Sequence, residues 1–124
     1  MSRIRSRNTQ PEVVVRRMAH GLGFRYVLHD GRLPGSPDLA FPARGKLIFV
    51  HGCFWHGHDC GRGYRPKANA AYWAAKIEAN RARDRRQLRA LRALGWRVMV
   101  VWECATRKDR LEKLERRLIK FLEP

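Results

Sequence analysis

The sequence lacks a long hydrophobic run. No apolar stretch approaches the roughly 18 residues that a membrane-spanning helix needs, which argues against an integral membrane protein. The first residues are rich in Arg and are not followed by the apolar stretch of a secretory signal. We therefore expect a soluble, intracellular protein.

Acidic residues are scarce. Eleven Asp and Glu stand against 27 Lys and Arg, which gives a formal net charge of +16. A charge of this size creates a strong field that attracts polyanions, so nucleic acid is the expected partner. A ribosome-associated or merely highly charged soluble protein is the alternative, and charge by itself says nothing about catalysis.

Cysteine is scarce as well, with Cys53, Cys60 and Cys104 as its only occurrences. An odd number of thiols in a chain without an export signal argues against a disulfide framework. Metal ligation is the better interpretation of these three residues.

The chain has the length of one domain, and 44% hydrophobic residues suffice for one core. Apolar periodicity and turn residues divide it into elements. We expect a basic arm over 1–8, helices over 10–22, 70–94 and 109–122, and strands over 24–28, 37–41, 46–50 and 96–102. This order predicts a single-domain α/β fold around one mixed sheet, spanning residues 1–124.

Histidine and cysteine crowd together after the strand expected over 46–50. The ten residues His51–Cys60 contain two thiols and three imidazoles, and Cys104 follows the end of another expected strand. Zn²⁺ prefers four N or S ligands in a tetrahedron, and three Cys with one His is a recognised structural set. Spacing alone leaves the fourth ligand open between His56 and His58. Ordinary buried thiols are the alternative.

A series of motifs extends on both sides of this cluster. Pro37-Asp38 precedes the strand that leads into His51-Gly-Cys-Phe-Trp-His-Gly-His-Asp-Cys60. The others, in order along the chain, are Phe24-Arg25-Tyr26, Leu33-Pro34-Gly35, Tyr72-Trp73 with Lys76-Ile77 and Asn80, Arg83-Asp84-Arg85, Gly95-Trp96-Arg97-Val98 and Val101-Trp102-Glu103-Cys104. In this combination, residues 3–105 resemble the very-short-patch-repair (Vsr) mismatch endonucleases.

The resemblance implies a nuclease fold related to the type II restriction enzymes, of the PD-(D/E)XK kind, with a structural zinc site. It implies Mg²⁺-dependent nicking of one DNA strand 5′ to the thymine of a T:G mismatch, as in the repair of deaminated 5-methylcytosine. The zinc would be held by Cys53, His58, Cys60 and Cys104, which leaves His56 for chemistry. We expect a monomer in the bacterial cytoplasm that binds double-stranded, mismatched DNA in the nucleoid, with mismatch-repair proteins as partners and no membrane.

Phosphodiester hydrolysis needs a hard cation, a base for water and stabilisation of the leaving oxyanion. Asp38, beside a turn at the sheet, suits Mg²⁺, and the resemblance adds the backbone carbonyl of Val50 as a second ligand. His56 resembles the water-activating base, and His51 resembles a second imidazole near the phosphate or the hydrated metal. These four residues are the expected centre of the active site.

Two further carboxylates have competing interpretations. Glu12 resembles the acid that supports the active site, although its spacing from Thr9 is also that of a helix capping box. Asp84 lies on the inward stripe of the helix expected over 70–94, where a carboxylate needs a partner. We expect Asp84 to orient a histidine or an arginine of the site, and a surface salt bridge is the alternative.

Aromatic residues suggest a contact with the bases. By the resemblance, Phe54, Trp55 and Trp73 enter the duplex beside the mismatch, and such wedging kinks DNA. Core packing is the more common fate of aromatic residues in a small domain. We expect Trp96 and Trp102, on an apolar strand, to lie in the core.

Three functions therefore compete. Strand-specific mismatch nicking leads, ahead of a nuclease of the same fold with a different DNA target. A zinc-stabilised nucleic-acid-binding module without catalysis is the third. The combination of Asp38 and His56 argues against the module, because pure binding has no use for an acidic metal ligand beside a phosphate.

Overall fold

The structure is a computed structural model that describes residues 9–58 and 67–123. The elements within these segments are α1 (Gln10–Gly21), β1 (Val27–Leu28), β2 (Leu39–Phe41), η1 (Pro42–Arg44), β3 (Lys46–His51), α2 (Ala70–Ala93), β4 (Arg97–Trp102), η2 (Glu103–Thr106), η3 (Lys108–Arg110) and α3 (Leu111–Leu122). None of the helices in these two segments has the length and apolar character needed to cross a membrane. The expected arm over 1–8 lies outside the described residues.

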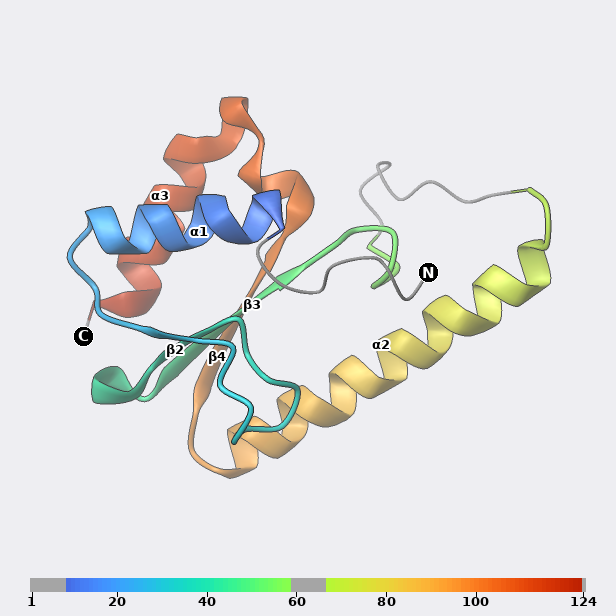
Figure 1. Ribbon diagram of the computed structural model, residues 1–124, viewed down its shortest axis with the longest axis horizontal. Helices are drawn as coiled ribbons and strands as arrows, with labels where there is room; N and C mark the ends of the chain where they lie inside the picture. Colours follow the sequence, from blue (N-terminus) through green and yellow to red (C-terminus); the bar gives the residue numbers. More distant parts are fainter. Residues whose placement is uncertain (1–8, 59–66, 124) are drawn as a thin grey trace.

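The strands form one mixed sheet in the order β1-β2-β3-β4. β1 and β3 are antiparallel to β2, whereas β3 and β4 are parallel, with His51 opposite Trp102. A parallel pair needs a crossover connection, and α2 provides it. In Figure 1, α1 and α3 lie on one side of the sheet and α2 on the other. The α/β class around one mixed sheet is therefore confirmed.

Buried apolar side chains cover both faces of the sheet. The first cluster joins α1 and α3 to the strands through Val15, Ala19, Leu39, Phe41, Ile48, Val101, Leu114, Leu118 and Leu122. The second joins the other face to α2 through Ala40, Leu47, Phe49 and Leu91. Successive residues of β3 point to opposite faces, so Ile48 belongs to the first cluster and Phe49 to the second. This agrees with the apolar run over 46–50, typical of a strand covered on both faces.

Several boundaries differ from the sequence expectation. The strand expected over 24–28 is only Val27–Leu28, because Phe24 is buried in the core beside α1. The Tyr26 hydroxyl donates to the Arg16 carbonyl of α1 at 3.2 Å, which also draws this segment toward the helix. The last helix starts at Leu111, two residues later than expected, because η3 precedes it.

Of the two tryptophans expected in the core, Trp96 packs against a core cluster and Trp102 does not. Trp96 is half-buried and packs against the α2-facing core cluster. The expectation that Trp102 lies in the core is wrong, because Trp102 is only half-buried at the end of β4. Its ring contacts the imidazoles of His51 and His58, which are polar residues outside both core clusters.

Candidate active site and thiol cluster

Three groups of potential metal ligands lie in the described part of the chain. Within each group the candidate ligand atoms are within 4.8 Å of one another. The groups are Glu12, His29 and Asp38; His51, His56 and Asp84; and Cys53, His58 and Cys104. All of these residues except His29 were singled out from the sequence.

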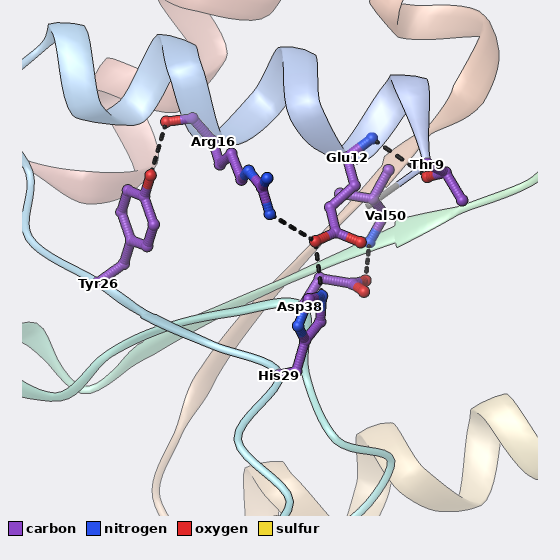
Figure 2. A network of polar contacts seen from close by, with 7 residues as sticks. All are labelled: Thr9, Glu12, Arg16, Tyr26, His29, Asp38 and Val50. Atoms are coloured by element: carbon purple, nitrogen blue, oxygen red, sulfur yellow. Dashed lines mark hydrogen bonds and ion pairs between the residues drawn. The ribbon is translucent and has the colours of Figure 1, made fainter. Parts of the chain in front are cut away.

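The first group joins the start of α1 to the sheet, as Figure 2 shows. Asp38 directly precedes β2, and its Oδ2 accepts a hydrogen bond of 2.7 Å from the backbone N–H of Val50. Glu12, almost fully buried in the first turn of α1, lies 2.6 Å from the His29 ring through Oε2 and Nε2. The backbone N–H of His29 donates to the Asp38 carbonyl at 3.1 Å. Two carboxylates and one imidazole are thus held together by backbone and side chain.

The first group contains two carboxyl side chains and one imidazole. Burial raises the pKa of the Asp38 carboxyl to about 6, and the nearby Glu12 carboxylate adds to the rise. The Val50 N–H and the His29 imidazole act in the opposite direction. A hard cation beside Asp38 would favour its ionised form, and carboxylate and carbonyl oxygens are the ligands that Mg²⁺ accepts. The donor set therefore fits a magnesium ion.

The second group joins the end of β3 to α2. The His51 and His56 rings are stacked, with centroids 3.9 Å apart and planes at 1°. Asp84, on α2, reaches the Nδ1 atom of His56 with its Oδ2 at 2.5 Å. Burial, reinforced by the neighbouring His56, lowers the pKa of His51 to about 4, while Asp84 opposes the shift. His51 is therefore neutral at pH 7.

One cavity of about 370 Å³ joins the first two groups. Its lining includes Asp38 and Val50, the stacked histidines, and Arg83 and Gln87 from α2. A potential cation ligand and a carboxylate-bound imidazole thus face the same space. This is the arrangement that metal-assisted hydrolysis of a phosphate ester requires.

The third group joins the loop after β3 to η2. The His58 Nδ1 atom is 3.6 Å from the Sγ atoms of both Cys53 and Cys104. Glu103 accepts a hydrogen bond of 3.2 Å from the Cys53 N–H, which ties the loop to the end of β4. Two thiols and an imidazole suit Zn²⁺. The expected fourth ligand, Cys60, lies outside the described residues.

The turn at Gly57 lies between His56 and His58 and directs their side chains to the second and third groups, respectively. His58 approaches the thiols, whereas His56 contacts Asp84, so the two side chains point to different groups. Gly57 has φ +65, and a Cβ there would lie 2.7 Å from Ile77 Cγ2 and 2.8 Å from Arg81 Cδ. Only glycine fits this combination of left-handed backbone and close approach to α2.

Phe54, Trp55 and Trp73 form a half-buried aromatic cluster. Their rings meet edge to face, with centroids 4.9 to 5.8 Å apart. Asn80 Nδ2 donates to the Trp55 carbonyl at 2.9 Å, which anchors the loop on α2. The three aromatic residues expected to act together therefore lie together, outside both core clusters. Their entry into DNA stays a prediction.

Two features of the site were not predicted from the sequence: the contact of His29 with Glu12, and the contacts of Trp102 with the histidines. His29 belongs to no periodic pattern, and only its place before the turn at Asp30-Gly31 could have drawn attention to it. It has φ +47, an uncommon conformation for a residue with a side chain and one that is enriched at functional sites. Trp102 stacks on His58 at 4.1 Å and meets His51 edge to face at 5.3 Å.

Comparison with known proteins gives the family. Residues 1–62 match the family model described as DNA mismatch endonuclease Vsr. The type II nicking enzyme V.XorIIP of Xanthomonas oryzae pv. oryzae is 53% identical over 124 residues, which cover 100% of this chain and 90% of that protein.

More distant relatives agree. The type II nicking enzyme V.NmeAIP of Neisseria meningitidis serogroup A is 40% identical over 123 residues, covering 95% of this chain and 88% of that protein. The DNA mismatch endonuclease Vsr of Escherichia coli K12 is 41% identical over 107 residues, covering 86% of this chain and 69% of that protein. With these similarities and its own set of clustered acids and imidazoles, the chain belongs to the Vsr family and is a DNA endonuclease.

Proposed function

We propose that this protein nicks one strand of double-stranded DNA 5′ to the thymine of a T:G mismatch. The observation that carries the proposal is the single cavity that Asp38 and Val50 share with His56 and Asp84. The relatives whose names describe mismatch or nicking endonucleases support the choice of substrate. The oligomeric state we propose is a monomer.

Asp38 and the Val50 carbonyl would hold Mg²⁺, since both residues line the cavity and the Val50 backbone contacts the Asp38 carboxylate. When bound, the ion supplies a positive charge that polarises the phosphate and stabilises the leaving oxyanion. The Val50 N–H donates to Asp38 Oδ2 and so fixes the orientation of the carboxylate. Glu12, held by His29, would support this wall from α1.

His56 would act as the general base. Its Nδ1 faces the Asp84 carboxylate, so the Nδ1 proton is donated to Asp84 and the lone pair of Nε2 is left for a water proton. The imidazolium that forms would be stabilised by the same carboxylate. Neutral His51, stacked on His56, adds a second imidazole that can hydrogen-bond the phosphate or the attacking water.

Cys53, His58, Cys60 and Cys104 would hold a structural Zn²⁺. Three of these residues already cluster, and they tie the loop after β3 to the end of β4. A tetrahedral ion at this point would fix the loop that carries His56, Phe54 and Trp55. The aromatic cluster would then enter the duplex beside the mismatch, where unstacking is least costly.

A nicking assay tests the proposal. Duplexes of one sequence, with either a T:G or a C:G pair at one position, are incubated with the protein and Mg²⁺, and the products are separated under denaturing conditions. We expect one cut 5′ to the mismatched T and little cutting of the matched duplex. Equal cutting of both would favour a nuclease with a different DNA target. Binding without cutting, in protein with its full zinc content, would favour a non-catalytic module.

A further inference from the structure

A second cavity, of about 210 Å³, opens beside the thiol cluster. Its lining combines the edge of that cluster with basic side chains from η3 and α3, namely His58, Trp102, Cys104, Arg110, Lys113 and Arg117. The proposed nicking reaction uses none of the three cations. They need an explanation of their own.

Arg110, Lys113 and Arg117 lie on one side of η3 and α3. Their spacing of three and four residues places them on one helical face. All three are exposed, and none forms an ion pair with any residue in segments 9–58 and 67–123. The nearby Arg107, by contrast, pairs with Asp109 at 3.4 Å. Three neighbouring positive charges that form no ion pair within these segments favour the binding of an anion.

A contact between two rings links this cavity to the candidate active site, because Trp102 lines the second cavity and His51 lines the first. Trp102 stacks on His58 at 4.1 Å on the side of the second cavity and contacts His51 at 5.3 Å on the side of the first. Because His51 and Trp102 are opposite each other in β3 and β4, each cavity has a lining residue at the same end of the sheet. A DNA strand with one phosphate in the first cavity carries further phosphates within a few ångströms along its axis.

We propose that the second cavity binds a backbone phosphate of the DNA substrate, next to the phosphate that is cut. The inference rests on the proposed action on DNA, and it adds a contact from α3, the helix farthest along the chain. The cations would neutralise the phosphate. The contacting rings of Trp102 and His51 would lie between this phosphate and the phosphate that is cut. Such a contact positions the strand and does not depend on base sequence.

Two charge-matched variants test this contact. Lys113→Ala/Arg117→Ala removes two cations from the cavity, and Arg116→Ala/Lys120→Ala removes two exposed cations of the same helix that line neither cavity. Binding to a matched, fluorescein-labelled duplex is measured by anisotropy over a series of salt concentrations, with no divalent cation added. Thermal midpoints confirm that both variants are folded.

The cavity variant should lower the slope of log affinity against log salt by about 0.9 for each phosphate that it no longer neutralises. Between 50 and 200 mM salt, wild type would then lose about 3-fold more affinity than the variant for each such phosphate. The control pair should leave the slope near that of wild type. Equal effects of the two pairs, or no effect of the cavity pair, would overturn the proposal.

A second measurement locates the bound phosphate. Duplexes with one neutral methylphosphonate at successive backbone positions should weaken wild-type binding at a phosphate beside the cut. The same substitution in the duplex should cost Lys113→Ala/Arg117→Ala less affinity than it costs wild type, because this variant keeps only Arg110 of the three cations that line the cavity. Absence of this coupling at every position would also overturn the proposal. Both measurements use binding only, so a failure of mismatch-specific nicking does not decide their outcome.

Discussion

Replacing Asp38 by Asn tests whether the candidate metal site is assembled at a cost to folding stability. Burial and the neighbouring Glu12 raise the pKa of Asp38 from 3.8 to about 6, so its ionisation is harder in the folded chain than in the unfolded one. A pKa difference of about 2 corresponds to about 3 kcal/mol. The Asp38→Asn variant has no charge to bury, so it escapes this cost.

The sign of the pH dependence follows from the raised pKa. Well below the unfolded pKa of 3.8 the carboxyl is protonated in both states and costs nothing. As the pH rises toward 6 the unfolded chain loses the proton first, so the free energy of unfolding decreases; above the folded pKa of about 6 the cost is constant. We expect Asp38→Asn to unfold about 10 °C above wild type at pH 8 and only about 2 °C above it at pH 4.

Calorimetry of both proteins at pH 4, 6 and 8 without divalent cations measures the difference. Asp30→Asn is the control, because the ion pair with Arg32 lowers the pKa of Asp30, and its loss should not stabilise the protein at pH 8. Added Mg²⁺ should raise the midpoint of wild type but not that of Asp38→Asn, and the variant should not nick DNA. A midpoint of Asp38→Asn at or below that of wild type at pH 8 would refute the reasoning.

Four further substitutions test the remaining parts of the site. His56→Ala should lower the nicking rate at least about 100-fold and keep its zinc, so zinc loss by elemental analysis would contradict the assignment. Cys104→Ala should lose zinc and unfold at a much lower temperature, and an unchanged zinc content would exclude Cys104 as a ligand. Gly57→Ala should lower the thermal midpoint, because its Cβ would lie 2.7 Å from a side chain of α2, whereas Gly31→Ala, with nothing within 4 Å, should not. Trp73→Ala should remove the preference for mismatched over matched duplexes without changing the salt slope; a lower midpoint with an unchanged preference would assign Trp73 to packing.

The elements with strong local signals could be predicted from the sequence. Thr9 caps α1, as its side chain accepts from the Glu12 N–H at 3.4 Å, and the apolar run of β3 is buried on both faces. The segment 24–28 has strand periodicity, yet most of it is not paired. Phe24 lies in the core cluster with residues of α1, and Tyr26 hydrogen-bonds to α1; local periodicity does not contain these tertiary contacts.

The site was predictable as a set of residues and less so as a geometry. Helical phase placed Asp84 inward, and the structure brings it to His56. Spacing could not tell which of His56 and His58 approaches the thiols, because their directions depend on the left-handed turn at Gly57. His29 belongs to no periodic pattern in the sequence, and its contact with Glu12 joins positions 17 residues apart, which spacing does not reveal.

The turn that separates His56 from His58 also limits how this loop can change in length. Surface loops usually tolerate insertions and deletions, and the chain from Cys53 to His58 would ordinarily be such a place. Here one added or deleted residue would rotate the two imidazoles relative to Asp84 and to the thiols at the same time. The length of this loop is therefore constrained by both metal-ligand groups at once.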